Sequence, residues 1–83
     1  MRHAREDALN ELEPLIIRLR KLPGLRERKR GAFYRGGSGF LHFHEDPAGL
    51  FADLKVNGEW IRMPVDTKAQ RDALVRDARN SLT

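Results

Sequence analysis

The residues best suited to bind a ligand or to act in catalysis are two histidines separated by one residue. His42 and His44 lie in the apolar and acidic segment 40–46. In a strand, residues two apart point to the same face, so both imidazoles could bind one metal ion or small ligand. Asp53 is expected opposite His42, and such a pair could act as a general base. A third interpretation is an ordinary polar row in which His42, Asp53 and Arg62 satisfy one another.

No nucleophile accompanies these histidines. Ser38 lies in a glycine-rich stretch, and Ser81 and Thr83 lie at the end of the chain. The stretch 36–39 joins two expected strands, so it lacks the helix N-terminus of a phosphate-binding loop. The absence of cysteine excludes disulfides, iron–sulfur clusters and thiol nucleophiles. We therefore expect a non-catalytic protein without a cofactor.

Helical periodicity marks the first quarter of the chain. Apolar residues recur at three- and four-residue spacing over 4–22, which predicts a helix ended by the Pro-Gly pair at 23–24. Pro14 either kinks this helix or lies in the first turn of a helix that begins near Glu13.

A second helix is expected at the end of the chain. It begins at Asp66 or Thr67, and Thr67 and Gln70 have the spacing of a capping box. Its modest apolar stripe contains Leu74, Ala78 and Leu82, with Ala73 and Val75 beside them.

Between the helices the apolar period changes to two. The expected strands are Ala32–Arg35, Phe40–Glu45, Leu50–Val56 and Glu59–Val65, with Leu25–Lys29 as a further short edge strand. Turn residues separate them at 36–39, 46–49 and 57–58, and the Asn-Gly pair at 57–58 favours a type I′ hairpin. The short connections make the sheet antiparallel. The predicted fold is therefore α+β, a single domain over 1–83, in which an N-terminal and a C-terminal helix cover one face of a four-stranded antiparallel meander.

The turn lengths fix a register that sorts the strand residues onto two faces. They place Val56 opposite Glu59, Glu45 opposite Leu50, and residue 35 opposite residue 40. The core face then holds Tyr34, Leu41, Phe43, Leu50, Ala52, Leu54, Val56, Ile61, Met63 and Val65. The other face holds Phe33, Arg35, Phe40, His42, His44, Phe51, Asp53, Lys55, Trp60 and Arg62.

Basic residues are concentrated in one segment. Sixteen lysines and arginines face twelve acidic residues, for a net charge of +4, and half of the basic residues lie in 18–35. Arg26, Arg28, Lys29 and Arg30 form a basic edge in this segment that could meet phosphates.

An aromatic and basic sheet face with nothing left to cover it predicts an interaction surface. Aromatic residues and arginine are enriched at interface centres, so we expect a homodimer or a partner-binding module. The alternative is a nucleic-acid-binding module that stacks bases on this face and uses the basic edge. A metal or small-ligand site at His42 and His44 is a further alternative.

Hydropathy gives no reason to expect a membrane partner. No apolar run approaches the roughly 18 residues of a membrane span, and residues 1–13 lack the apolar stretch of a signal peptide. We therefore expect a cytoplasmic protein.

Three short motifs carry a family resemblance. They are Leu22-Pro23-Gly24, Gly31-Ala32-Phe33, and His44-Glu45-Asp46-Pro47 followed by Leu50. Their order resembles the MmcQ/YjbR-like small bacterial proteins, in which a helix ending in Leu-Pro-Gly leads into an antiparallel sheet. The resemblance implies that fold order and a DNA-binding role suggested for the family, but no enzymatic activity. The His-x-His strand and the Ala-Asp pair at 52–53 are also similar to small luciferase-like domains, without implying luciferase chemistry.

Overall fold

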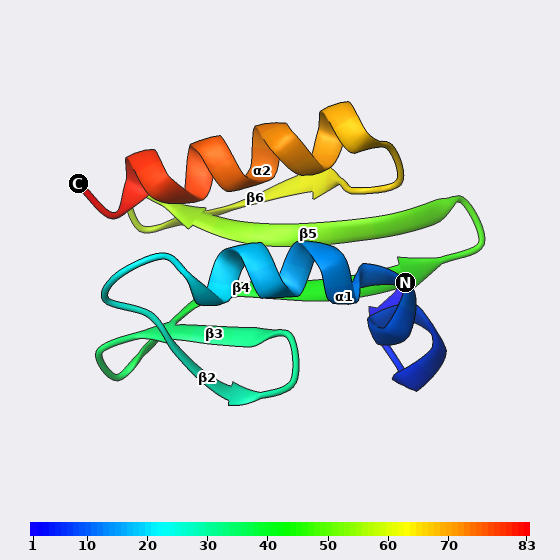
Figure 1. Ribbon diagram of the computed structural model, residues 1–83, viewed down its shortest axis with the longest axis horizontal. Helices are drawn as coiled ribbons and strands as arrows, with labels where there is room; N and C mark the ends of the chain where they lie inside the picture. The colour runs from blue at the N-terminus through cyan, green and yellow to red at the C-terminus, as the bar shows by residue number, and fades with distance from the viewer.

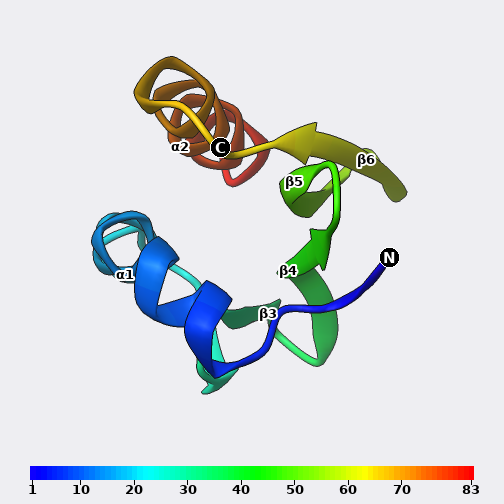
Figure 2. The same cartoon turned by 90° about the vertical axis from the view of Figure 1, so that its right-hand side faces the viewer.

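The computed structural model describes residues 1–83 as two helices and one six-stranded antiparallel sheet (Figure 1). The elements are β1 (Arg2–His3), α1 (Glu6–Arg20), β2 (Arg26–Lys29), β3 (Ala32–Arg35), β4 (Ser38–Asp46), β5 (Gly49–Val56), β6 (Glu59–Pro64) and α2 (Lys68–Ser81). The strand order is β2-β3-β4-β5-β6, and β1 also pairs with β4. Figure 2 shows α1 and α2 on the same side of the sheet. Neither helix has the length and apolar character needed to cross a bilayer.

The predicted α+β class, with two helices and an antiparallel sheet, is confirmed, but the predicted number of four strands is wrong. The segment considered as a further edge strand forms β2. The sixth strand, β1, is only two residues long and pairs antiparallel with the far end of β4. A strand of two residues is too short to show an alternating pattern, so periodicity could not reveal it.

Pro14 lies inside α1, because the helix begins at Glu6. Proline has no N–H to donate to the carbonyl of Asn10, and its ring crowds that carbonyl, so helices bend at this residue type. Figures 1 and 2 show that the first half of α1 runs at an angle to the second half. Of the two alternatives, the structure therefore has the kink. Both halves still bury apolar residues against the sheet, namely Ala8, Leu12, Leu15, Ile16 and Leu19.

The cap and two of the turns are as predicted. Thr67 is the N-cap of α2, and its hydroxyl accepts from the Gln70 N–H at 3.1 Å while the Gln70 side chain accepts from the Thr67 N–H at 3.0 Å. Asn57 and Gly58 have φ of 51° and 82°, the positive values that a type I′ turn requires. The β4–β5 and β5–β6 pairings consequently have the predicted register, including His42 opposite Asp53.

Strand β3 pairs with β4 in a register that differs from the predicted one. Arg35 lies opposite Ser38 and Phe33 lies opposite Leu41, so the turn contains only residues 36–37. The ladder then shifts by one residue, which is a β-bulge in β4.

This bulge corrects the predicted face of four residues. Phe33, and Phe40 at the bulge itself, are core residues with 2% and 3% exposure. The Arg35 side chain donates to the carbonyl of Ser81 in α2 at 3.0 Å, so it lies on the helix side. Tyr34, predicted to be a core residue, is only half-buried. The predicted assignment was wrong because it counted four turn residues and no bulge.

The core lies between the helices and the sheet. Of the predicted core residues in the sheet, Leu41, Phe43, Ala52, Leu54 and Val65 are buried. Ile61 is not, because its position on the last strand leaves it 46% exposed. The buried cluster contains Leu12, Leu15, Ile16, Leu19, Leu22, Phe33, Phe40, Leu41, Phe43, Ala52, Leu54, Val65, Leu74, Val75 and Ala78.

The corrected register can be tested by comparing two aromatic deletions. We expect Phe33→Ala to lower the free energy of unfolding by about 3–5 kcal/mol, because it opens a cavity in the core. Trp60→Ala should cost less than half as much, since Trp60 is 44% exposed. Urea unfolding of the wild type and both variants measures the difference. Equal costs would instead favour the register in which both residues share the exposed face.

Candidate functional site

The side of the sheet opposite the helices carries most of the residues singled out in the sequence. We call it the outer face and define it as Tyr34, His42, His44, Phe51, Asp53, Lys55, Trp60 and Arg62, together with His3 of β1. Seven of these nine were predicted to share a face. Tyr34 was assigned to the core, and His3 was missed because nothing in the sequence marks a two-residue strand.

Trp60 is the most exposed aromatic residue of the outer face. Its ring lies 4.7 Å from the His42 ring, and the Lys55 ammonium lies 4.7 Å from the Trp60 ring on the neighbouring strand. Gly39 lies under the indole, and a Cβ added there would make an ordinary van der Waals contact of 3.6 Å with the ring. Trp60 therefore contacts His42 of β4 and Lys55 of β5 while 44% of its surface remains exposed.

Asp53 is the electrostatic centre of the outer face. Arg62 binds both oxygens of its carboxylate, with N–O distances of 2.8 and 2.9 Å. These hydrogen bonds lower the pKa of Asp53 below its ordinary value. The second carboxylate oxygen also lies 3.0 Å from Nε2 of His44, although the angles there are not those of a hydrogen bond. The predicted polar row thus exists, but the histidine nearest the carboxylate is His44 and not His42.

The three histidines of the chain converge on one spot. The antiparallel pairing of β1 with β4 places His3 opposite His44, and their rings stack at 4.8 Å. The His42 ring lies 4.9 Å from His44 and 5.7 Å from His3. One nitrogen from each ring lies within 4.8 Å of the other two. The predicted pair at 42 and 44 is therefore part of a cluster of three.

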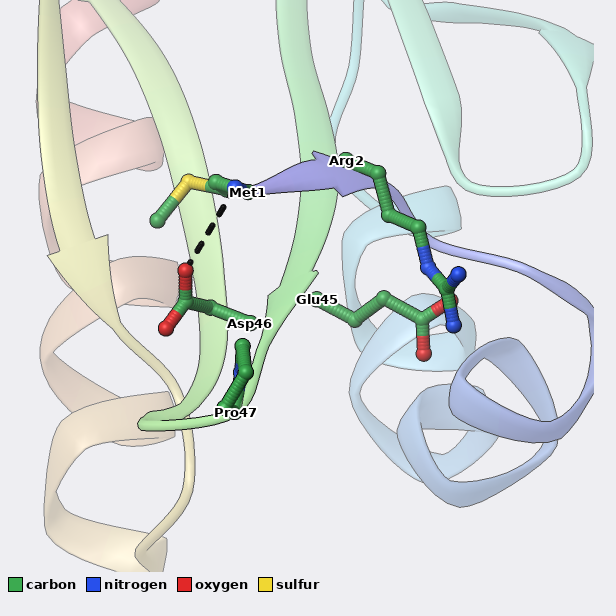
Figure 3. Close-up of a pocket in the computed structure, with 5 residues that line it drawn as sticks. All are labelled: Met1, Arg2, Glu45, Asp46 and Pro47. Atoms are coloured by element: carbon green, nitrogen blue, oxygen red, sulfur yellow. Dashed lines mark hydrogen bonds and ion pairs between the residues drawn. The ribbon is translucent and has the colours of Figure 1, made fainter.

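Contacts on both sides of β1 hold His3 in this cluster. The Ala4 N–H donates to the carbonyl of Phe43 at 3.1 Å. The Glu45 carboxylate accepts from the Arg2 side chain at 3.0 Å and from the Arg5 N–H at 3.3 Å. Figure 3 shows β1 lying along β4, with Arg2 and Glu45 at the edge of a shallow hollow.

A groove of about 470 Å³ runs beside the cluster. It occupies the space between β1 and β3, which pair with different parts of the same edge of β4. Half of its lining residues are hydrophobic. The lining residues also include His3, His42, Tyr34 and Arg30. A ligand in this groove would therefore touch both an apolar wall and two imidazoles.

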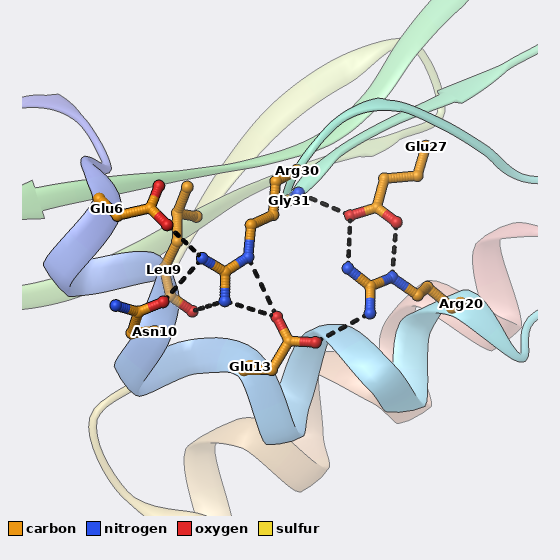
Figure 4. A network of polar contacts seen from close by, with 8 residues as sticks. All are labelled: Glu6, Leu9, Asn10, Glu13, Arg20, Glu27, Arg30 and Gly31. Atoms are coloured by element: carbon orange, nitrogen blue, oxygen red, sulfur yellow. Dashed lines mark hydrogen bonds and ion pairs between the residues drawn. The ribbon is translucent and has the colours of Figure 1, made fainter.

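The predicted basic edge is partly used to hold the fold together. Arg30 donates to Glu13 at 2.8 and 3.1 Å, to Glu6 at 3.1 Å and to Asn10 at 2.8 Å (Figure 4). These partners all belong to α1, so Arg30 ties the β2–β3 hairpin to the helix. The hydrogen bonds from Arg30, followed by those from Arg20, lower the pKa of Glu13.

A neighbouring carboxylate completes this network. Burial alone would raise the pKa of Glu27, but hydrogen bonds from Arg20 and the Gly31 N–H outweigh it and the pKa is lowered. The Arg28 guanidinium lies over the Tyr34 ring at 4.7 Å. Of the four basic-edge residues, Arg26 and Lys29 are thus the exposed cations without such a partner. Two cations give weaker support to the nucleic-acid interpretation than the four in the sequence.

The other edge of the sheet has a different character. β6 is the last strand in the order, and its first four residues, 59–62, are exposed. Trp60 is 44% exposed on the outer face and Ile61 is 46% exposed on the helix side. An edge strand with large apolar side chains exposed on both faces is unusual in a monomeric protein.

Comparison with protein-family models, curated proteins and solved structures gives no significant match. The resemblance to MmcQ/YjbR-like proteins therefore stays a prediction, and the function has to be argued from the geometry.

The environment of His42 predicts a pH dependence of stability. Burial lowers its pKa below the ordinary value of 6.5, and the nearby charges of His44, His3 and Arg62 lower it further, against the opposing effect of Asp53. Below pH 6.5 the unfolded chain then binds more protons than the folded one, so stability falls as the pH falls from about 7 through the folded pKa.

We expect His42→Gln to remove this contribution. The free energy of unfolding of the variant should decrease less steeply than that of the wild type between roughly pH 8 and pH 5. Urea titrations of both proteins at several pH values measure the two slopes. Parallel curves would show that His42 titrates alike in both states.

Proposed function

We propose that the protein is a non-catalytic interaction module that self-associates, with β6 as the strand at which two copies meet. The observation that carries the proposal is the exposure of Trp60 and Ile61 on opposite faces of an unpaired edge strand. An edge strand offers a row of free N–H and C=O groups, and a second edge strand satisfies them. Pairing of two β6 strands would bury both apolar side chains at the same time.

Charge and face restrict the way in which two β6 strands can pair. Directly opposed residues must lie on the same face of the joined sheet, so the two-fold axis passes by a residue and not between two residues. Ile61 and Arg62 are the two residues at the middle of β6, where an axis pairs most of the strand. An axis at Arg62 would set the two guanidinium groups against each other. An axis at Ile61 sets isoleucine against isoleucine and places Trp60 opposite Arg62 of the second copy, which is a favourable cation–π pair. Pro64, which has no N–H, then lies outside the paired segment.

The helix side of β6 favours the same axis. Ile61 lines a hollow of about 480 Å³ together with Leu54, Val56 and Met63. The last turn of α2 forms its other wall, with Asp77, Asn80 and Ser81. Because α2 leaves this apolar floor exposed, a second Ile61 placed opposite the first would extend the core across the two-fold axis and remove apolar surface from water.

We expect the wild type to have about twice the 9.6 kDa mass of one chain, and Ile61→Lys to have the mass of one chain. The substitution sets two ammonium groups against each other on the two-fold axis, which opposes pairing. The matched control is Ile17→Lys on α1, since Ile17 is 44% exposed and lies away from β6. It should keep the dimer mass. Sedimentation velocity over a dilution series measures all three proteins.

A charge exchange tests the position of the axis. Ile61→Glu should also be monomeric, whereas an equimolar mixture of Ile61→Lys and Ile61→Glu should regain the dimer mass, because each lysine then faces a glutamate. A wild type with the mass of one chain at every concentration would refute the proposal. A dimer that persists in both single variants would place the interface elsewhere.

A further inference from the structure

The histidine cluster is built across two strands that are distant in the sequence. His3 comes from β1, and His42 and His44 come from β4. These are all the histidines of the chain, and one nitrogen from each lies within 4.8 Å of the other two. Three imidazoles on one zinc ion have their nitrogens about 3.3 Å apart, because each N–Zn distance is about 2.0–2.1 Å. His3 is exposed, so rotation of its side chain can close the difference.

Two ring nitrogens of the cluster are buried and have no hydrogen-bond partner, namely Nδ1 of His42 and Nε2 of His44. A buried polar atom without a partner is costly, and its usual explanation in a folded protein is a water, an ion or a catalytic role. Burial also favours the neutral form of His42, which is the form that binds metal, by lowering its pKa.

The surroundings of His44 resemble the outer shell of a metal site. Asp53 lies 3.0 Å from Nε2 of His44, without the angles of a hydrogen bond, and is itself fixed by two hydrogen bonds from Arg62. Metal-binding histidines commonly direct one ring nitrogen to a carboxylate, which orients the ring and leaves the other nitrogen for the ion. The bidentate pairing with Asp53 also offsets the positive charge of Arg62, which would otherwise repel a cation.

We propose that His3, His42 and His44 bind a divalent transition-metal ion of the zinc type, and that the His44 ring turns on binding so that its Nε2–H donates to Asp53. Imidazole ligands suit zinc, nickel, copper and cobalt far better than calcium or magnesium. Three protein ligands leave a fourth position of a tetrahedral ion for water or another molecule. His3 and His42 also line the groove beside the cluster, so that position is accessible to a small ligand held there.

Titration with zinc and with cobalt tests the site directly. We expect one zinc ion per chain by calorimetry, and the visible absorption bands of tetrahedral cobalt when Co²⁺ replaces zinc. His3→Ala, His42→Ala and His44→Ala should each abolish the cobalt bands, and Asp53→Asn should weaken zinc binding by about 10- to 100-fold. Glu59→Gln, which removes an exposed carboxylate of the same sheet, serves as the control and should bind like the wild type.

A second measurement on the unmodified protein guards against variants that fail to fold. Zinc should shift the imidazole NMR signals of all three histidines together. Zinc binding that survives His42→Ala and His44→Ala would overturn the proposal, because the ion would then be held by His3 and nearby backbone alone. Failure of the wild type to bind zinc or cobalt would overturn it as well.

The metal proposal does not depend on self-association. All three ligands belong to one chain, so Ile61→Lys, the variant designed to be monomeric, should bind zinc as the wild type does. A monomeric wild type that binds zinc would refute only the proposed dimer. A dimeric wild type that does not bind zinc would refute only the proposed metal site.

Discussion

Strand β4 pairs with β5 along one edge, and two other strands share its second edge. β3 pairs with its first part and β1 with its last part. This division brings an N-terminal segment beside a strand some forty residues later, and it opens the groove between the two partners. It also places His3 against His44. The histidine cluster and the groove therefore both follow from the fact that β3 is too short to cover the whole of β4.

Much of the outer face could be predicted from the sequence, because turn chemistry and alternation agree over β4, β5 and β6. The Asn57-Gly58 turn fixes the β5–β6 register, and the turn at 46–49 fixes the β4–β5 register that sets the partners of His42 and His44. The β3–β4 connection has no such determinant. Glycine lacks a side chain that would prefer one face, so a stretch rich in glycine is compatible with a two- or a four-residue turn. The bulge that decides between them buries Phe33 and Phe40 in the core, which only tertiary packing requires.

The basic segment shows why charge counted along a sequence overstates the charge available to a partner. Arg20 and Arg30 bind Glu13 and Glu27, and this network joins α1 to the hairpin of β2 and β3. The kink at Pro14 comes directly after Glu13. The sequence does not show which arginine binds which glutamate, because the glutamates are seven or more residues away from their arginine partners. Cations that hold a fold together in this way are not free to neutralise phosphates.

The two edges of the sheet differ in a way that limits the size of any assembly. β2 ends the sheet with Arg26, Arg28 and Lys29, whereas β6 ends it with Trp60 and Ile61. When two copies join through β6, both outer ends of the combined sheet are β2 strands, and like charges there discourage further addition. A head-to-tail contact of β6 with β2 could instead repeat without end and build a filament. In the proposed dimer, the cationic edge would make the assembly finite, so that it closes at two chains and does not grow.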